Sequence, residues 1–442
     1  MFKTLKNALK TPEVRKKLLY TLLLIVVFRF GCYITVPGVD IVALNESMQQ
    51  STVSLTGLID TISGGAFSRL SIFAMSISPY ITAQIVIQLL SMIIPSLEAL
   101  TKDGGPEAKA KINRYTKILC LVLSLVEGLG IYFSYSSSGI FINPGFLTGF
   151  VIVMSLVAGT SMLIWLGEQI TKSGIENGIS MLIFVGIVSG FPGLVTTLKN
   201  LMFTATGFST KGLLLAIAII VGAIVLIAAV VFIQEAERRI PVQYAKKVVG
   251  RKMYGGQSTH IPVKLAMAGV MPIIFASSFM TFPAMIIQIF GKSALEAQKG
   301  FLYGLYQFSM ATSSSQVPWQ YSLANAIVYF VLIVLFTYFY TTLVFSPAEI
   351  SNNIKQNGGF IPGIRTGKPT TEYLESVINK LTLVGGVCLS FIAIIPMLLR
   401  FSNLNISFGG TTILIVVGVA LEMMRQLESQ LVMRHYKGFL EK

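Results

Sequence analysis

The sequence predicts an all-α membrane protein with ten transmembrane helices, from its composition and from the spacing of its long apolar runs. Hydrophobic residues make up 53% of the 442 residues and charged residues 12%, about half of the roughly 25% charged share of soluble domains. Such a chain has too little charge to cover a surface in water. A soluble domain, a disordered chain and a disulfide-bonded secreted domain are therefore excluded.

Each predicted span is an apolar run long enough to cross a hydrocarbon core of about 30 Å, which takes about 20 residues. The spans are roughly 18–36, 71–94, 118–136, 148–169, 179–198, 213–234, 265–290, 323–345, 374–399 and 408–432. Spans two, five, seven and nine contain proline. Membrane helices tolerate proline when neighbouring groups satisfy the freed carbonyls, so we expect kinked helices around an interior.

The first span follows a basic segment and resembles the start of a signal peptide. No small-residue cleavage site follows it, and Arg29 interrupts the apolar run. We therefore expect an uncleaved first span.

The first outer segment, about 37–70, ends in a stretch that is half apolar and rich in glycine, too short to span. This stretch is either an ordinary packed outer loop or a re-entrant segment, which exists at membrane depth only inside protein or beside a water-filled cavity.

Lys and Arg are distributed very unequally between the two sides. With the N-terminus inside, 27 of the 34 fall in inner segments and 6 in outer ones. The positive-inside rule then places both termini in the cytoplasm. The inner loops 95–117, 235–264 and 346–373 are long and polar, so the net charge of +15 is available there to anionic lipid or to an acidic or RNA-containing partner.

Ten spans divide into five and five, which permits two inverted halves, residues 1–198 and 199–442. No convincing repeat relates the two halves in sequence.

Catalytic motifs are not found in the sequence. The chain has two histidines, and both stretches that resemble a phosphate-binding loop lack a required glycine, with Pro362 and Ile286 at those positions. Its three cysteines lie inside apolar runs without metal-ligand spacing. We expect neither an enzyme nor a cofactor.

Ionisable residues inside spans are candidates for function because a charge in lipid is costly. Arg29 could be a structural charge bonded to helix-end carbonyls or a conduction element. Glu127 must face an aqueous interior, find a partner on another span or be protonated.

Two isoleucine pairs share a helix face at i, i+4 spacing, Ile77 with Ile81 and Ile183 with Ile187. Such residues usually face lipid or pack in the core, and spacing alone gives them no other role. Polar residues that could join helices by hydrogen bonds lie near some of these positions, namely Thr82, Gln84, Gln88, Ser277 and Ser278.

Segments along the whole chain resemble the SecY family of protein-translocation channels, in the family's order. They are Ser63-Gly-Gly-Ala-Phe-Ser-Arg-Leu-Ser-Ile-Phe-Ala74, Ile77-Ser-Pro-Tyr-Ile81, Trp165–Thr171 with Gly178–Ser180, Glu235–Lys246, Gln257–Lys264, Phe360–Thr370 and Phe408–Ile415. The resemblance implies two five-helix halves around an hourglass pore with a re-entrant plug helix.

The family's functional positions can be carried over residue by residue. The resemblance implies a pore ring of apolar side chains at Ile77, Ile81, Ile183, Ile187, Ile274 and Ile415. It implies a plug at about 56–67, with Thr56, Leu58, Ile59, Ile62, Gly64, Gly65 and Phe67. It implies a lateral gate between spans two and three and spans seven and eight, with Thr82, Gln84, Gln88, Glu127, Ser277 and Ser278.

The resemblance also implies partners. Loops 235–264 and 346–373 would dock the SecA motor or the ribosome, with Arg251 and Arg365 as candidate contacts. The expected assembly is a heterotrimer with SecE and SecG in a bacterial plasma membrane, which passes unfolded preproteins and binds their signal sequences. Glu127 stands where relatives often carry glutamine, and Thr366 follows Arg365 where many carry proline.

The function implied is a passive protein-conducting channel that also releases membrane segments sideways into lipid. The alternative is a secondary transporter for a small solute. That alternative needs a compact polar site with coupling-ion ligands, which the spans do not supply.

Overall fold

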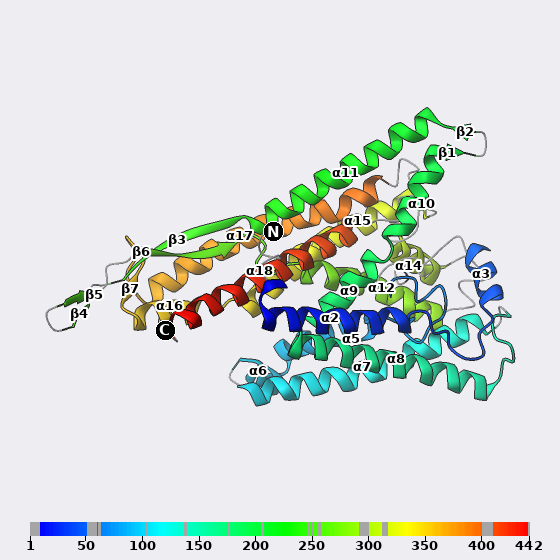
Figure 1. The fold of residues 1–442 in the computed structure, drawn as a ribbon, viewed down its shortest axis with the longest axis horizontal. Coiled ribbons are helices and arrows are strands. Elements are labelled where there is room, and N and C mark those ends of the chain that lie inside the picture. Colours follow the sequence, from blue (N-terminus) through cyan, green and yellow to red (C-terminus); the bar gives the residue numbers. More distant parts are fainter. Residues whose placement is uncertain are drawn as a thin grey trace.

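The computed structural model describes residues 9–50, 60, 63–102, 105–136, 139–175, 177–204, 207–244, 247–249, 252–254, 258–290, 300–311, 317–399 and 410–440. The molecule is a bundle of long helices that run roughly along its longest dimension (Figure 1).

The elements follow one another in this order. The helices are α2 (Pro12–Gly31), α3 (Ile41–Gln50), α5 (Ser78–Ile93), α6 (Pro95–Lys102), α7 (Pro106–Tyr135), α8 (Phe146–Ser173), α9 (Gly178–Val188), α10 (Phe191–Met202), α11 (Thr210–Glu235), α12 (Met271–Phe290), α14 (Phe301–Met310), α15 (Trp319–Val344), α16 (Pro347–Gln356), α17 (Lys368–Leu399) and α18 (Gly410–Leu440). The strands are β1 (Phe203–Thr204), β2 (Gly207–Phe208), β3 (Glu237–Tyr244), β4 (Lys247–Val249), β5 (Lys252–Tyr254), β6 (Ser258–Lys264) and β7 (Gly359–Phe360).

Each of the ten predicted spans overlaps a helix of this bundle, and span five overlaps two. The spans correspond in order to α2, α5, α7, α8, α9 with α10, α11, α12, α15, α17 and α18. By length and composition alone, six helices within the described residues could cross a membrane, or seven if α5 and α6, bent by 108°, are one span.

Proline accounts for two differences from the predicted spans. Helix α5 begins at Ser78 and not at residue 71, because Pro79 occupies its first turn and starts a helix there without loss of a hydrogen bond. The fifth span is broken after Val188, and Pro192 stands in the first turn of α10. The apolar run therefore overestimated the length of α5, whereas the fifth span runs from Gly178 to Met202 with a break between α9 and α10.

The outward surface of the helices is apolar. On α11, Leu214, Ile217, Ile220, Ile224 and Phe232 are all exposed. A water-soluble protein does not expose such a continuous apolar helix face, whereas lipid solvates it. The predicted all-α membrane fold is confirmed, and the chain is a multi-pass membrane protein.

Within the bundle, helices from the beginning of the chain contact helices from its end. Helix α12 packs against α15 and also against α5 and α7, and α9 packs against α18. The predicted boundary between the halves, at 198/199, lies inside α10, which continues through the short β1–β2 pair into α11.

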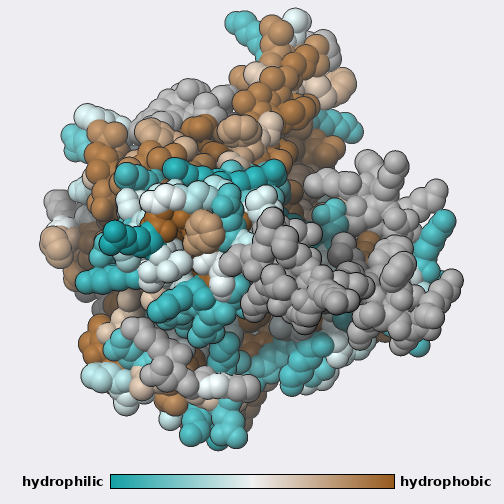
Figure 2. Space-filling view, turned by 90° about the vertical axis from the view of Figure 1, so that its left-hand side faces the viewer, coloured by the Kyte–Doolittle hydropathy of each residue, from teal (hydrophilic) through white to brown (hydrophobic). Residues whose placement is uncertain are grey.

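The predicted inner segments lie together at one end of the molecule. Helices α6 and α16 and strands β3, β6 and β7 lie at the left in Figure 1, and the outer elements α3, α10 and α14 lie at the right. Seen from the inner end, the surface is mostly hydrophilic, whereas the flanks are apolar (Figure 2).

The inner loops form a small sheet, which the sequence analysis did not predict. Strand β3 pairs with β6 over seven residue pairs, from Glu237↔Lys264 to Gln243↔Ser258, and its end pairs with β7. Beneath the sheet lies the inner-loop cluster of buried apolar residues, Ile240, Val242, Val263, Ile354, Ile361, Leu374, Val377 and Ile378. Loops 235–264 and 346–373 are therefore one folded unit.

Candidate functional site

The six predicted ring isoleucines all belong to, or pack against, the main apolar cluster of the bundle, whose buried members run from Leu24 to Leu421. Ile77 and Ile81 come from the start of α5, Ile183 and Ile187 from α9, Ile274 from α12 and Ile415 from α18. Five of the six are at most 8% exposed, and Ile274 is half-buried against the same cluster. None of the six lies among the exposed apolar residues that form the outer surface of the bundle.

Local structure sets the two isoleucine pairs in place. The Asn177 side chain accepts a hydrogen bond from the Ile179 amide and so begins α9. Gly178 allows α9 to approach α8 closely, because a Cβ at this position would overlap the Gly167 carbonyl. This contact holds the start of the helix that carries Ile183 and Ile187.

The predicted plug is described only in part. Thr56, Leu58, Ile59 and Ile62 lie outside the described residues. Gly64 and Gly65 form a turn with positive φ angles of 68° and 85°. Phe67 is buried in a second cluster together with Leu70, Ile140 and Ile152.

A polar network shapes this turn. The Asp60 carboxylate accepts a hydrogen bond from the Ser68 amide at 2.8 Å. The Ser63 hydroxyl donates to the Asp60 carbonyl and accepts from the Phe67 amide. These bonds keep residues 63–68 folded as one compact turn.

Arg29 reaches this turn from the first span. Its Nη1 donates to the Gly64 carbonyl at 2.9 Å and to the Ser189 hydroxyl at 3.0 Å. Of the two roles open at the sequence level, this geometry favours the structural one, since Arg29 is bonded to a backbone carbonyl and to the residue that ends α9.

The predicted gate residues lie on three helices that touch one another. Helix α12, with Ser277 and Ser278, packs against α5, with Thr82, Gln84 and Gln88, and against α7, with Glu127. The hydroxyls of Thr82 and Ser277 donate to carbonyls of their own helices, those of Ser78 and Ile274. Among the described residues, no hydrogen bond or ion pair joins α12 to α5 or α7.

Glu127 lies half-buried on α7. Within the described parts of the chain, no hydrogen bond or ion pair involves its carboxyl group. Of the three alternatives for this residue, an ion-pair partner on another span is thus not found in the described chain.

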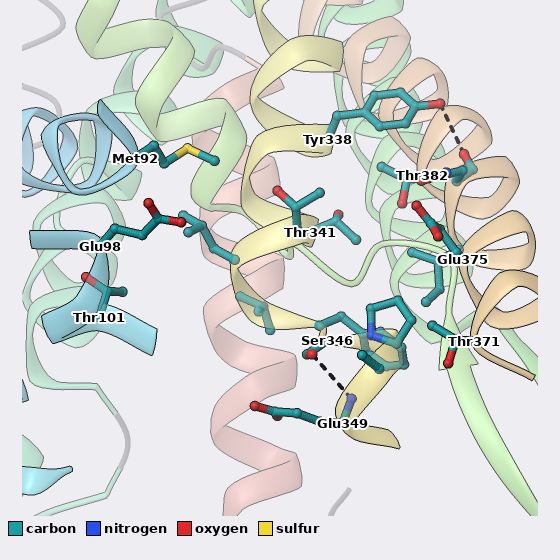
Figure 3. Close-up of a pocket in the computed structure, with 18 of the residues that line it drawn as sticks. Met92, Glu98, Thr101, Tyr338, Thr341, Ser346, Glu349, Thr371, Glu375 and Thr382 are labelled. Atoms are coloured by element: carbon teal, nitrogen blue, oxygen red, sulfur yellow. Dashed lines mark hydrogen bonds between the residues drawn. The ribbon is translucent and has the colours of Figure 1, made fainter. Parts of the chain in front are cut away.

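A cavity of about 730 Å³ lies at the inner end, between α5–α6 on one side and α15–α17 on the other. Glu98 faces Thr341 and Ser346 across it (Figure 3). Glu349 and Glu375 add two more carboxylates to its lining, and Thr382 lines it with a buried hydroxyl that has no hydrogen-bond partner in the described chain. The cavity is therefore polar and acidic.

These carboxylates were missed in the sequence analysis. Ser346-Pro-Ala-Glu349 has the spacing of a capping box, and the Ser346 side chain does accept a hydrogen bond from the Glu349 amide at the start of α16. That signal could have located the helix, but not the cavity, which is formed by residues far apart in the chain.

Arg365 is exposed at the inner end, on the turn between β7 and α17. The Thr370 hydroxyl donates to the Arg365 carbonyl at 2.8 Å, and Gly363 and Gly367 adopt positive φ angles of 82° and 101°. These features give the turn a defined shape with threonine at position 366. Arg251 lies outside the described residues.

Ionic contacts tie the inner loop to the last helix. Arg425 on α18 donates to the Gln234 carbonyl at 3.0 Å and pairs with the Glu235 carboxylate at 2.6 Å. Burial lowers the pKa of Lys264 at the end of β6, and the nearby Arg425 guanidinium acts in the same direction. The base of the sheet is thus positioned against α18.

Known proteins are similar to this chain over its whole length. The sequence model of the SecY family matches residues 71–424. The chain is 42% identical over 455 residues to protein translocase subunit SecY of Streptomyces scabiei, with 100% of both chains covered. It is 41% identical over 453 residues to that of Thermus thermophilus, covering 100% of this chain and 98% of the relative.

Solved structures support the fold. A structure described as that of a protein conducting channel matches with a TM-score of 0.67 at 22% identity, covering 93% of this chain and 91% of that chain. Sec61 in a canine ribosome–channel complex from the endoplasmic reticulum matches with a TM-score of 0.63 at 20% identity, with the same coverage.

Proposed function

The chain belongs to the SecY family of protein-translocation channels, and from this premise we propose how its residues conduct polypeptides. The function is that of a channel for unfolded secretory proteins and not that of a carrier for a small solute. The observation that supports the proposed pore is the placement of six isoleucines from four helices, five buried and Ile274 half-buried, in the apolar core between the two halves, residues 1–198 and 199–442.

The ring isoleucines close the empty pore to ions and move apart when a polypeptide passes through it. A dewetted apolar constriction is a barrier to ions. Isoleucine side chains form no hydrogen bonds with the substrate, so polypeptides of any sequence can pass. The plug, about residues 56–67, closes the outer side of this constriction.

The gate opens between α5 and α7 on one side and α12 and α15 on the other. Two features support this proposal: the absence of hydrogen bonds from α12 to α5 or α7 in the described chain, and the inner cavity between α5–α6 and α15–α17. An apolar signal sequence gains free energy by partition into lipid, so the substrate itself shifts the gate toward its open state.

The driving force comes from partners, since the sequence contains no complete phosphate-binding loop. Arg365, and Arg251 of the predicted loop 235–264, contact the SecA motor or the ribosome. Sec61 is part of a ribosome–channel complex, which supports the ribosome as a partner here. SecE and SecG complete the heterotrimer in the bacterial inner membrane, with both termini cytoplasmic and the basic inner face on anionic lipid.

Crosslinking tests the pore directly. Cys32, Cys120 and Cys388 are first replaced by serine, and single cysteines are introduced at the six ring positions. A secretory substrate stalled in the channel should crosslink to them. The matched control is Ile220→Cys on α11, an isoleucine that is 47% exposed on the lipid-facing surface. Crosslinks at position 220 without any at the ring positions would contradict the proposed pore.

A further inference from the structure

Arg29 is a half-buried cation in the last turn of α2, the helix of the first predicted span, and its contacts with two other segments need an explanation. A charged side chain at membrane depth is costly unless protein groups or water solvate it. Its Nη1 atom donates two hydrogen bonds, one to the Gly64 carbonyl and one to the Ser189 hydroxyl at the end of α9. Gly64 lies in the turn formed by residues 63–68, which we call the plug turn. We propose that Arg29 is a latch that holds the plug against the fifth span in the closed channel, an inference that rests on the proposed function.

The latch lies next to the ring. Ser189 ends α9 two residues after Ile187, and its hydroxyl donates to the Gly186 carbonyl at 2.6 Å. This bond fixes the hydroxyl so that its oxygen accepts from Arg29. One guanidinium thus joins the first span, the plug turn and the end of the helix that carries two ring isoleucines.

The plug turn is shaped to fit the latch. Gly64 has a φ of +68°, which is unfavourable for other residues. A Cβ at this position would lie within 3 Å of the Ser189 hydroxyl, the Arg29 guanidinium and the Gly186 carbonyl. Only glycine lets the backbone approach both partners this closely.

The plug turn is connected to the body at its other end by backbone bonds. The Val36 amide donates to the Leu70 carbonyl, and the Ile72 amide donates to the Ile34 carbonyl. These bonds tie residues 70–72 to the segment that follows α2, so residues 70–72 act as the hinge. The Arg29 bonds lie beyond the hinge, on the part of the turn that moves.

Hydration couples the latch to the pore. In a dry interior, a charge-assisted hydrogen bond is strong and its loss is costly. When a substrate opens the ring, water enters and can solvate the guanidinium in place of Gly64 and Ser189. The Arg29 bonds are part-buried in this structure, so the latch is stronger in the closed channel and weaker once more water enters.

The chain offers a matched control for the latch. Arg69 carries the same charge in the same region and lies 4.2 Å from the Tyr33 ring centroid, whereas Arg29 lies 5.8 Å from it. The Arg69 side chain is exposed, and none of its contacts in the described chain is a hydrogen bond to the plug turn.

The experiment measures resting ion conductance of the purified heterotrimer in planar bilayers, together with hydrogen exchange of the plug turn. Arg29→Gln and Ser189→Ala should each raise both, Arg29→Gln by about tenfold and Ser189→Ala by a few-fold. Arg29→Lys should restore part of the closure, and Arg69→Gln should leave both readouts at the wild-type level.

Three outcomes separate the latch from the proposed pore. Wild-type conductance and exchange in Ser189→Ala and in folded Arg29→Gln would overturn the latch. An equal rise in Arg69→Gln would also overturn it, since the effect would then follow charge alone. Serine at the ring positions raises conductance whether or not the latch exists, so the latch can fail while the pore stands. If Arg29→Gln does not assemble, Ser189→Ala decides alone.

Discussion

The apolar cluster that contains the six isoleucines of the proposed ring, which we call the ring cluster, differs from the inner-loop cluster in how its parts are held together. Around the inner-loop cluster, strands β3 and β6 pair over seven residue pairs, and the Ser351 and Thr370 hydroxyls bond to backbone carbonyls of the adjoining turn. Around the ring, α12 meets α5 and α7 without a hydrogen bond among the described residues. This contrast is the one expected if the loops keep one shape and the proposed ring separates.

The physical reason lies in directionality. Apolar contacts can slide and re-form at little cost, whereas hydrogen bonds are lost abruptly when their geometry changes. A docking surface must present its charges in fixed positions to a partner. A pore must change its width for each substrate. Three variants test this contrast, and they are given from the largest expected effect to the smallest.

Val242→Asp should disrupt the inner-loop cluster. Val242 is fully buried in that cluster, and an unpaired charge there costs several kcal/mol, at least about 3. We expect rapid proteolysis within 235–264 and loss of SecA-driven export, while the resting conductance stays low. The control is Gln243→Asp, next in the strand but exposed. Equal proteolysis of both variants would contradict a rigid docking unit.

Replacing four ring isoleucines with serine should let ions through the pore without disrupting the inner loops. The four positions are Ile77, Ile81, Ile187 and Ile415. The smaller polar side chains favour water in the constriction and remove its barrier. We expect a several-fold rise in resting conductance, measured in planar bilayers, with export retained. Ile220→Ser on the outer face of α11 is the control. A resting conductance as low as that of the wild type in the fourfold variant would contradict a role for these residues in sealing the pore.

Of the three variants, Arg365→Glu should have the smallest effect, limited to SecA-driven export. Its exposed side chain lies on a turn that is held by backbone contacts, so assembly and thermal stability should be unchanged. Export driven by SecA should fall several-fold, because the charge at the docking surface is reversed. Lys172→Glu, exposed in the last turn of α8 and outside both docking loops, serves as the control for charge alone. Wild-type export by Arg365→Glu would exclude a docking role for this residue.

Much of the fold could be predicted because its signals are local. Each of the ten spans predicted from hydropathy overlaps a helix. Pro79 marks where α5 begins later than the apolar run suggests, and Pro192 follows the break between α9 and α10. The strands were missed, although Arg239-Ile-Pro-Val-Gln243 alternates between exposed and buried residues as a half-buried strand does. The loops were interpreted as polar connections because their overall composition is hydrophilic.

By itself, the sequence determined the membrane fold, the placement of the spans and the segregation of positive charge, since each depends on composition within a short window. Its motifs also identified the family. Only the tertiary structure decided that Arg29 bonds to Gly64 and Ser189, that the two inner loops share one sheet and that Glu98 faces α15 and α16 across a cavity. Those contacts join residues tens to hundreds of positions apart, and no local pattern of hydropathy or charge encodes such pairings.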